Sequence, residues 1–273
     1  MTPASYPVVH TVTIHKMSEL LKISKGNAKL RNKFIFSLPA GYTCPNAGVC
    51  KTFAGKAGGG IMDLSVPGEV PSFRCFAASQ EAQYTNVRRA RWHNYEALRA
   101  VSMDLPHEEA AEAMASLIEI SFAHFFNHRN YNTYDVRIHE SGDFFNESYF
   151  LAWMKVAERN PMRRFYAYTK SLDIWLRYSE SLPSNLYLTA SFGGHLDSMI
   201  LRYPHVFTRY SRVVYTPAEA MALGLSIDHD DSHCFGESPF ALLVHGTQAK
   251  GSDASKAIVE RRKKGQFSGY AKA

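Results

Sequence analysis

An alternation of short apolar strands with longer helical segments runs through most of this chain and limits the folds it can adopt. The predicted strands, rich in β-branched and aromatic residues, are 34–38, 134–139, 164–168, 186–189, 212–215 and 241–244. The predicted helices are 77–100, 107–127, 148–159, 172–180, one between the loop at 191–194 and the strand at 212–215, and 217–223. Strands that alternate with helices form parallel sheets. The sequence therefore predicts an α/β fold with a single parallel (β/α) barrel, complete or partial, similar to a TIM barrel.

We expect one domain with two peripheral segments. The barrel-like domain is predicted to span residues 17–252, after an N-terminal extension at 1–16. The terminal residues 253–273 include the run Arg261-Arg262-Lys263-Lys264, which predicts a basic, mobile tail. Within the domain, the stretch 51–72 is rich in Gly, Lys and Pro and predicts an exposed excursion.

The charge balance favours a polyanionic partner. Lys and Arg number 31 against 25 acidic residues, which gives a net charge of +6. No apolar run approaches the roughly 20 residues of a membrane span, so we expect a cytoplasmic protein. Basic residues interleaved with aromatic ones suit phosphate contact and base stacking, and nucleic acid, DNA or RNA, is the expected partner. The candidate contacts are Lys29, Arg88, Arg89, Arg91 and Trp92. The alternative is a solvated helix face with the tryptophan turned inward.

Four cysteines predict a metal centre. Cys44, Cys50 and Cys75 lie in the first third of the chain, in a loop region after the strand at 34–38, and Cys234 comes far downstream. Four thiolates suffice for a [4Fe-4S] cluster or, alternatively, for zinc. Inert thiols are the main alternative, because the spacing matches neither a zinc knuckle nor a ferredoxin run. Disulfides are expected less, because the first residues lack the features of a signal peptide.

Polar residues recur where the predicted strands end. Strand ends of a parallel barrel share one mouth, so such residues can line a single pocket. Asp143 is the leading candidate, as a ligand acceptor, general base or nucleophile, because the two phenylalanines that follow it could desolvate its carboxylate. The alternative role is a helix N-cap. The further candidates are His139 and Lys170 as catalytic residues, and Ser141, Gly142, Thr169 and Ser191 as cofactor contacts. A surface position is the alternative for the lysine.

The segment His229-Asp230-Asp231-Ser232-His233 concentrates ligand and acid–base residue types. We predict catalytic roles for Asp230 and Asp231 and cofactor contacts for His229 and His233. Asp and Ser are also common in ordinary loops. If Cys234 binds the metal, the whole segment comes to the site.

A set of motifs spread over residues 17–252 resembles the gene product 88 family of phage and plasmid proteins. The motifs are Gly26-Asn27-Ala28-Lys29, Cys44-Pro45 to Cys50, Arg74-Cys75-Phe76-Ala77-Ala78-Ser79, Val87-Arg88-Arg89-Ala90-Arg91, Ser141-Gly142-Asp143-Phe144, Tyr168-Thr169-Lys170-Ser171 and His229-Asp230-Asp231-Ser232-His233. For a phage-encoded member, the expected location is the cytoplasm of the host cell.

The chain also has a more distant similarity to radical S-adenosylmethionine enzymes. Cys75-Phe76-Ala77 resembles the third cysteine of their cluster loop, and Ser141-Gly142-Asp143 resembles the strand-end motif that holds the methionine amine. The resemblance implies a barrel and a [4Fe-4S] cluster on Cys44, Cys50 and Cys75. The sequence differs from these enzymes in two ways. The tight C-x3-C-x2-C spacing is absent, and Cys234 could bind the fourth iron of the cluster. A cluster with four cysteine ligands would leave no iron for S-adenosylmethionine.

The leading hypothesis is an iron–sulfur barrel enzyme that acts on or beside nucleic acid, with a pocket around Asp143. The second is a base-exchanging transglycosylase of the 7-deazaguanine type, by analogy of fold, with an aspartate nucleophile and a structural metal. The third is a non-catalytic nucleic-acid-binding or redox-sensing protein in which a cluster only stabilises the fold.

Overall fold

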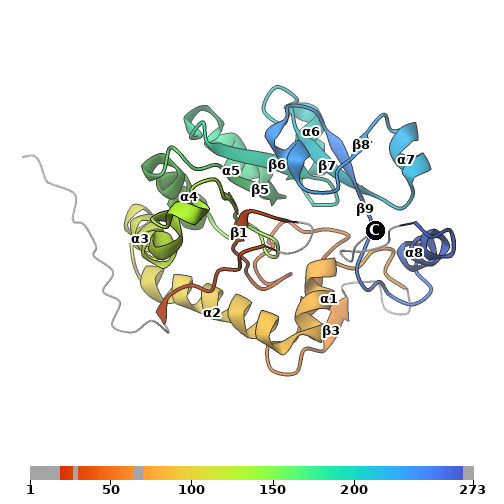
Figure 1. Ribbon diagram of the computed structural model, residues 1–273, viewed down its shortest axis with the longest axis horizontal. Helices are drawn as coiled ribbons and strands as arrows, with labels where there is room; N and C mark the ends of the chain where they lie inside the picture. The colour runs from red at the N-terminus through yellow and green to blue at the C-terminus, as the bar shows by residue number, and fades with distance from the viewer. Residues whose placement is uncertain (1–18, 27–29, 64–69, 267–273) are drawn as a thin grey trace, which may run out of the picture.

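The computed structural model describes residues 19–26, 30–63 and 70–266, and within these ranges its centre is a seven-stranded sheet with every neighbouring pair of strands parallel. The strand order is β1-β4-β5-β6-β7-β9-β8, and the sheet curls into half of a barrel (Figure 1). Its strands are β1 (Lys33–Ile35), β4 (Asp135–Arg137), β5 (Phe165–Thr169), β6 (Leu186–Ser191), β7 (Tyr210–Val214), β8 (Ser226–Ile227) and β9 (Phe240–Leu243). The predicted α/β fold with a partial, TIM-barrel-like sheet is confirmed.

Helices connect the strands, as the sequence predicts. They are α1 (Phe76–Gln83), α2 (Thr85–Ser102), α3 (His107–Phe126), α4 (Glu147–Arg159), α5 (Leu172–Arg177), α6 (Asp197–Arg202), α7 (Pro217–Ala222) and α8 (Asp253–Lys263), with short 3-10 helices η2 (Arg129–Tyr131), η3 (Ser179–Ser181) and η4 (Ser232–Phe235). The single helix predicted over 77–100 is two helices, because Tyr84 has extended backbone (φ −114°, ψ 105°). No helix among the described residues is long and apolar enough to cross a membrane.

The two faces of the sheet have different surroundings because side chains alternate along each strand. Phe165 and Ala167 point to the helical layer and join the main core, where Trp153 of α4 is fully buried. Tyr166 and Tyr168 belong to a separate cluster inside the half-barrel. The outer face is thus an ordinary apolar core, whereas the inner face carries hydroxyl and charged groups.

A short plug fills part of the half-barrel. The 3-10 helix η4 contacts β5 and β6, and Cys234 on it is fully buried against Tyr166 and Phe240. Strand β9 lies between β7 and β8 instead of after them. Strand β8 was not predicted, because two residues are too few to show a periodic pattern.

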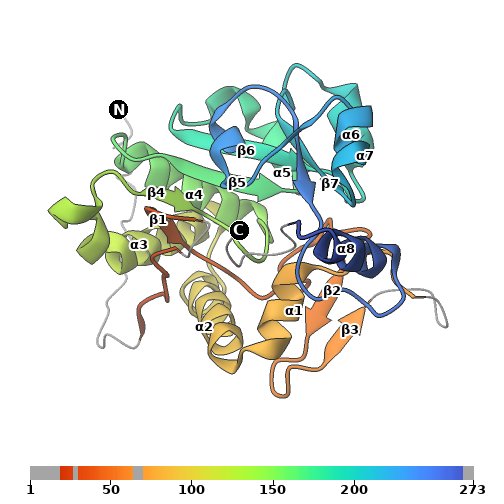
Figure 2. The same ribbon diagram turned by 45° about the vertical axis from the view of Figure 1, so that its right-hand side comes forward.

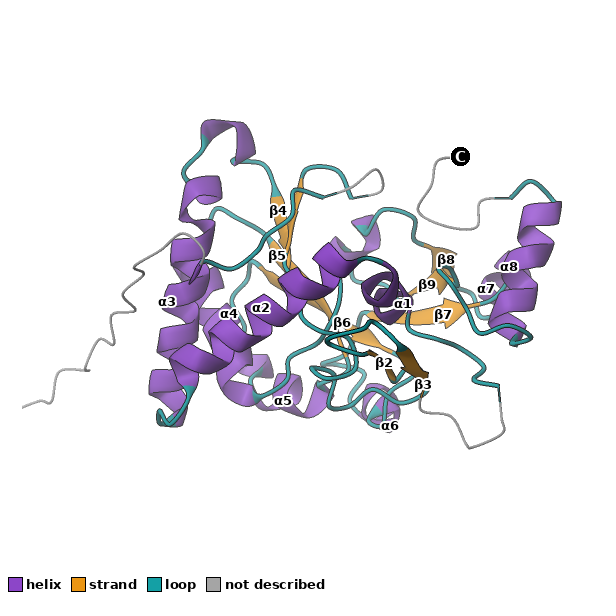
Figure 3. Ribbon diagram, turned by 90° about the horizontal axis from the view of Figure 1, so that it is seen from below, coloured by secondary structure: helices purple, strands orange, loops and turns teal. Residues whose placement is uncertain are grey.

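The excursion predicted at 51–72 contains an ordered hairpin. Strands β2 (Thr52–Ala54) and β3 (Ile61–Asp63) pair in antiparallel register, and α1 contacts both. The hairpin, α1 and α2 lie together on one side of the sheet (Figure 2). Viewed from below, α2 runs from α1 to α3 across this side (Figure 3).

The C-terminal segment differs from the mobile tail predicted at 253–273. Its first part is α8, which begins with a Ser252 side-chain cap and buries Ala254 and Ile258 against Phe73 and Val244. The apolar residues spaced along this helix outweigh its basic end in deciding its packing. Residues 267–273 and the predicted extension at 1–16 lie outside the described part of the chain.

Two of the predicted nucleic-acid contacts are internal to the fold. Arg88 and Arg91 on α2 are only 5% and 2% exposed. The Arg88 guanidinium donates to the carbonyl oxygens of Glu81 at 2.9 Å and Lys56 at 3.2 Å, so it joins the end of α1 to the hairpin. Arg91 donates to the Ala77 carbonyl at 2.8 Å. The predicted role for these two arginines is therefore not supported. Arg88 binds one of the last carbonyls of α1, which have no helical partner, and Arg91 binds the Ala77 carbonyl and the Glu81 carboxylate within the fold.

We predict that Arg88→Met lowers the free energy of unfolding by about 2–3 kcal/mol, because it removes charge-assisted hydrogen bonds and leaves buried carbonyls unpaired. Urea unfolding measures the change. Arg89→Met is the matched control, since Arg89 is exposed on the same helix, and it should change stability by less than about 0.5 kcal/mol. Equal stability of the two variants would contradict the structural role of Arg88.

Candidate functional site

A cavity of about 590 Å³ lies at the edge of the sheet where the parallel strands end. Its wall comes from the cysteine loop, the segment before α1, and the residues that follow β4, β5 and β6. The predicted site residues that line it are Cys44, Cys50, Cys75, His139, Ser141, Gly142, Asp143, Thr169, Lys170, Ser191 and Asp231. The predicted residues at the strand ends therefore line one cavity, as expected for strands that end at the same edge of a sheet.

The loop that carries Cys44 and Cys50 is attached to the loop after β6. Ala47 forms an antiparallel bridge with Gly194, and the Gly48 amide donates to the Gly193 carbonyl at 3.1 Å. A Cβ atom at Gly48 would lie 2.8 Å from that carbonyl oxygen, closer than real side chains approach. Glycine at 48 therefore lets the cysteine loop pack directly on the strand-end loop.

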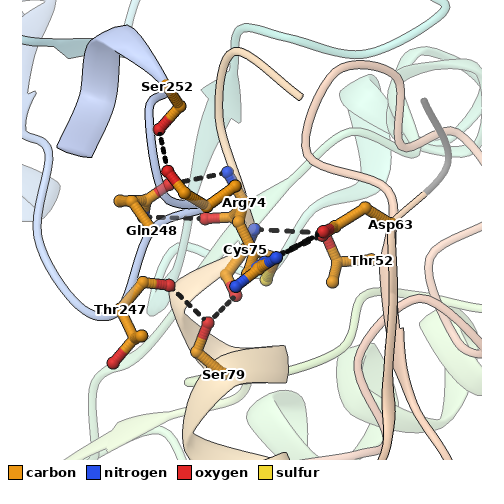
Figure 4. Close-up of polar contacts among 9 residues, drawn as sticks. Thr52, Asp63, Arg74, Cys75, Ser79, Thr247, Gln248 and Ser252 are labelled. Carbon is orange, nitrogen blue, oxygen red and sulfur yellow. Dashed lines mark hydrogen bonds and ion pairs between the residues drawn. The ribbon is translucent and has the colours of Figure 1, made fainter. Parts of the chain in front are cut away.

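An ion pair and a hydrogen bond hold the segment with Cys75 beside the hairpin (Figure 4). The Arg74 guanidinium makes two-pronged contact with Asp63, with donor–acceptor distances of 2.5–3.1 Å. The Cys75 amide donates to the Thr52 hydroxyl at 3.3 Å. Because Thr52 and Asp63 are paired residues of the hairpin, these contacts return Cys75 to the neighbourhood of Cys50 despite the long spacing in sequence.

A second set of contacts ties the same segment to the chain after β9. Gln248 accepts from the Arg74 amide at 2.7 Å and donates to the Arg74 carbonyl at 2.9 Å. The Ser79 hydroxyl donates to the Thr247 carbonyl at 2.8 Å (Figure 4). The segment before α1 is thus fixed from both sides.

The pKa values of Cys44 and Cys75 depend on burial and on neighbouring thiols. Burial raises the pKa of Cys44 well above its ordinary value, and the nearby Asp143, Cys75 and Cys50 raise it further. Burial raises the pKa of Cys75 to about 11, and Cys50 adds to this shift. Within the described ranges, no group of three or more His, Cys, Asp and Glu side chains is arranged to hold a single metal ion. These shifts keep the Cys44 and Cys75 thiols protonated at neutral pH.

Asp143 is placed by a tight turn after β4. Gly142 has φ +89°, and a Cβ atom there would lie 2.6 Å from the Thr43 hydroxyl. The Asp143 carboxylate accepts from the Thr169 hydroxyl at 2.6 Å, the Lys170 amide at 2.8 Å and the Phe144 amide at 2.7 Å. Glycine is therefore required here both for its backbone angle and for space.

Burial raises the pKa of Asp143 from its ordinary 3.8 to about 6, although its three hydrogen bonds oppose the shift. The alternative role of Asp143 as the N-cap of α4 is wrong. The cap is Asn146, whose side chain accepts from the Tyr149 amide at 2.9 Å. Asp143 is thus available to the cavity.

His139 and Ser141 place buried polar atoms beside Asp143. His139 Nε2 shares a hydrogen bond of 3.1 Å with the Tyr149 hydroxyl. Burial, with help from Arg137, lowers the pKa of His139 to about 3, so the imidazole is neutral. His139 Nδ1 and the Ser141 hydroxyl have no hydrogen-bond partner in the described structure. Buried polar atoms without partners are rare in folded proteins and are expected to meet a ligand or water.

Lys170 is directed inward rather than to the surface. Its ammonium group donates to the Ser191 hydroxyl at 2.7 Å and to the carbonyls of Ser191 at 3.1 Å and Phe192 at 2.9 Å. It therefore fixes the end of β6 against the end of β5, on the wall of the cavity.

Asp231 receives several donors on the inner face of the half-barrel. Its carboxylate accepts from Arg137 at 2.7 Å, from the Tyr166 hydroxyl at 3.0 Å and from the Tyr168 hydroxyl at 3.3 Å. Its backbone is left-handed (φ 65°), an uncommon conformation for a residue other than glycine. The surrounding hydrogen bonds hold this conformation, which is a feature found often at functional sites.

The rest of the predicted set lies elsewhere. His229, Asp230, His233 and Cys234 do not line the cavity. Cys234 packs among aromatic rings on η4, and the Asp230 carboxylate accepts from the Ser232 amide in a local turn. Cys234 therefore does not bring its segment to the cavity that the other three thiols line. Only Asp231 of this segment reaches the cavity.

Of the three remaining predicted nucleic-acid contacts, Arg89 and Trp92 lie within the described residues. Lys29 lies outside the described residues, and Arg89 is exposed. Trp92 packs edge-on against Tyr42 and Tyr95, with ring centroids 4.9 and 6.0 Å away. This packing corresponds to the alternative in which the tryptophan turns inward.

Sequence reasoning missed Arg137 and Tyr168, which also line the cavity. Both lie on strands that the sequence predicts. An arginine within a predicted buried strand is the signal that could have identified Arg137, since buried charges are nearly always paired.

We predict that the stability difference between the protein and its Asp143→Asn variant depends on pH. The folded state of the protein holds the Asp143 proton more tightly than the unfolded state. Asp143 therefore stabilises the fold below about pH 4, and this contribution is lost as the pH rises through about 6. The difference in unfolding free energy should fall by about 2–3 kcal/mol between about pH 4 and pH 7. His139 titrates in both proteins, so its effect cancels. A constant difference would show that the pKa of Asp143 is not raised.

No curated protein sequence and no solved structure is significantly similar to the chain. Residues 16–262 match the sequence profile of the family described as gene product 88. This match covers most of the chain, including the cysteine loop, the strand ends and α8. The chain therefore belongs to the gene product 88 family.

Proposed function

We propose that this gene product 88 protein is an iron–sulfur enzyme whose [4Fe-4S] cluster is bound by Cys44, Cys50 and Cys75. The observation that carries the proposal is that three thiols from two separate segments line one cavity at the carboxyl edge of a parallel half-barrel. Active sites of barrel enzymes lie at this edge. Thiolates are the usual ligands of iron–sulfur clusters.

The residues fit a cluster better than a single zinc ion. The thiols are close enough that Cys50 and Cys75 raise the pKa of Cys44 and Cys50 raises the pKa of Cys75. No group of side chains in the described part of the chain is arranged around a single ion. A cluster is larger than one ion, so its ligands stand further apart. Cys75 directly precedes α1, and backbone amides of that helix lower its pKa in part, which helps a thiolate to form.

Three ligands would leave one iron of the cluster for another molecule. Binding of Cys234 to the fourth iron would block S-adenosylmethionine. Cys234 instead packs among aromatic side chains on η4, so it does not argue against an open iron. When bound, a cluster with an open iron supplies single-electron reduction of S-adenosylmethionine. In this arrangement, the Asp143 carboxylate and the Ser141 hydroxyl would accept hydrogen bonds from the amine of that cofactor, and Lys170 would fix the adjoining wall.

The other two hypotheses have less support. For a transglycosylase, Asp143 would have to be a nucleophile, but each of its oxygens accepts at least one hydrogen bond, which weakens a carboxylate as a nucleophile. Oδ2 accepts only one from the described residues, so it can still accept a second hydrogen bond from an amine. Asp230 does not line the cavity and Asp231 is bound to Arg137. A cluster that only stabilised the fold would need no adjoining space, whereas the thiols lie on a cavity of about 590 Å³.

We predict that anaerobically purified protein is brown and contains on the order of four irons and four sulfides per chain. Cys44→Ser, Cys50→Ser and Cys75→Ser should each lose most of this iron, because each removes one thiolate ligand. Cys234→Ser is the matched control and should keep it. Iron, sulfide and zinc analysis with visible absorption measures the outcome. A colourless protein with one zinc per chain, or equal loss in all four variants, would contradict the proposal.

We further predict that S-adenosylmethionine changes the electron paramagnetic resonance spectrum of the reduced protein. Asp143→Asn should weaken this binding about tenfold, because one charged hydrogen-bond acceptor is lost. Asp230→Asn is the control and should bind like the unchanged protein. An iron-loaded protein whose spectrum does not respond to S-adenosylmethionine would exclude the open-iron arrangement while leaving the cluster itself in place.

A further inference from the structure

The cavity has two chemically different halves. The half formed by the ends of β4, β5 and β6 is polar and contains Asp143, Thr169, Lys170 and Ser191. The other half, formed by the segment before α1 and by β5, β7 and β9, is lined mainly by aromatic and aliphatic side chains, with Arg212 and His245 among them. The apolar and aromatic lining residues are Phe73, Phe76, Tyr168, Val213, Tyr215 and Leu242. Such walls bind flat apolar surfaces.

The side chains of the apolar half are held in place. Phe73, Val213 and Tyr215 belong to the cluster that α8 covers, and Tyr168 and Leu242 belong to the cluster around η4. The Tyr215 hydroxyl donates to the Ser72 carbonyl at 3.1 Å. Phe76 packs against the His245 ring, with centroids 4.0 Å apart and an interplanar angle of 31°. The walls are therefore preformed.

One carboxylate provides hydrogen-bonding capacity in this half. Asp231 lines the cavity, and its charge is balanced by Arg137 at 2.7 Å. Asp231 Oδ2 receives the two shorter bonds, whereas Oδ1 receives a longer bond of 3.3 Å from Tyr168. A carboxylate oxygen can accept two hydrogen bonds. Oδ1 can therefore accept from a neutral N–H donor, and the paired charge gives no preference for a cation.

We propose that this half of the cavity binds a planar heteroaromatic ring with N–H donors, of the nucleobase type, between its aromatic walls and Asp231. The proposal names the substrate class of the iron–sulfur site and rests on the proposed function for the reaction that follows. The binding itself depends only on Asp231 and the apolar wall. The ring can belong to a free nucleoside or to a base of a single strand.

The test uses two purines and the full-length protein. Guanosine has N–H donors, whereas caffeine has a purine ring with no N–H group. Titration calorimetry should show that guanosine binds about tenfold or more tightly than caffeine, because a site built for a hydrogen bond rejects a ligand that lacks it. Equal affinity, or binding of neither purine, would overturn the proposal.

Variants assign the effect to the site. Asp231→Asn should remove the discrimination between the two purines, and Asp230→Asn should leave it unchanged. Because Asp231→Asn also disturbs Arg137, Leu242→Arg is a second variant that places charge in the apolar wall. It should abolish binding of both ligands while the protein remains folded by circular dichroism. Retained binding in Leu242→Arg, or equal effects of the two aspartate variants, would overturn the assignment.

One additional measurement distinguishes a free nucleoside from a base within a nucleic acid strand. A second distinguishes failure of the iron–sulfur proposal from failure of the ring-binding proposal. Tighter binding of a short single strand with one guanine than of guanosine would identify a base within nucleic acid, and weaker binding would identify a free nucleoside. Iron analysis of the same samples is independent of these results. Discrimination between the purines without iron would contradict the proposed function only, whereas iron without purine discrimination would contradict this inference only.

Discussion

The parallel direction of every strand in the half-barrel is the constraint on which the candidate site depends. It brings the carboxyl ends of β4, β5 and β6 to one edge, so that Asp143, Lys170 and Ser191 contact one another or share a partner. The Lys170 amide binds Asp143 and its ammonium binds Ser191, so one residue connects three neighbouring strand ends. An antiparallel strand in this series would carry one of these groups to the opposite edge.

The hairpin explains how a widely spaced cysteine can join this edge. The entropic cost of closing a loop rises slowly with its length, by about 0.6 kcal/mol for each doubling. The extra residues between Cys50 and Cys75 therefore add little cost. The paired Thr52 and Asp63 then bind Cys75 and Arg74 from the returning segment. Tertiary contacts thus hold Cys75 near Cys50 although the two cysteines are far apart in the sequence.

The sequence was sufficient for six of the seven strands of the parallel sheet, for most helices and for the grouping of the strand-end residues, because these follow from periodicity and parallel topology. It was not sufficient where tertiary contacts decide. Arg88 looks the same in sequence as the exposed Arg89, and only the carbonyls of α1 and the hairpin distinguish them. Likewise, α8 has a basic end that suggests a free tail, but Ala254 and Ile258 bury against Phe73. Such contacts join segments that are distant in sequence, and local patterns do not contain them.

The 3-10 helix η4 places two residues that are close in sequence in different surroundings. Asp231 and Cys234 are three positions apart, yet Asp231 reaches the cavity while Cys234 lies among Tyr166 and Phe240. The left-handed backbone at Asp231 turns the chain into η4, and Arg137 holds the carboxylate at this turn. A half-barrel leaves its inner face open, so some segment must cover it. By covering it with η4, the fold buries the fourth thiol in an apolar environment and presents a carboxylate to the cavity instead. A count of cysteines alone therefore overstates the number of thiols at the cavity.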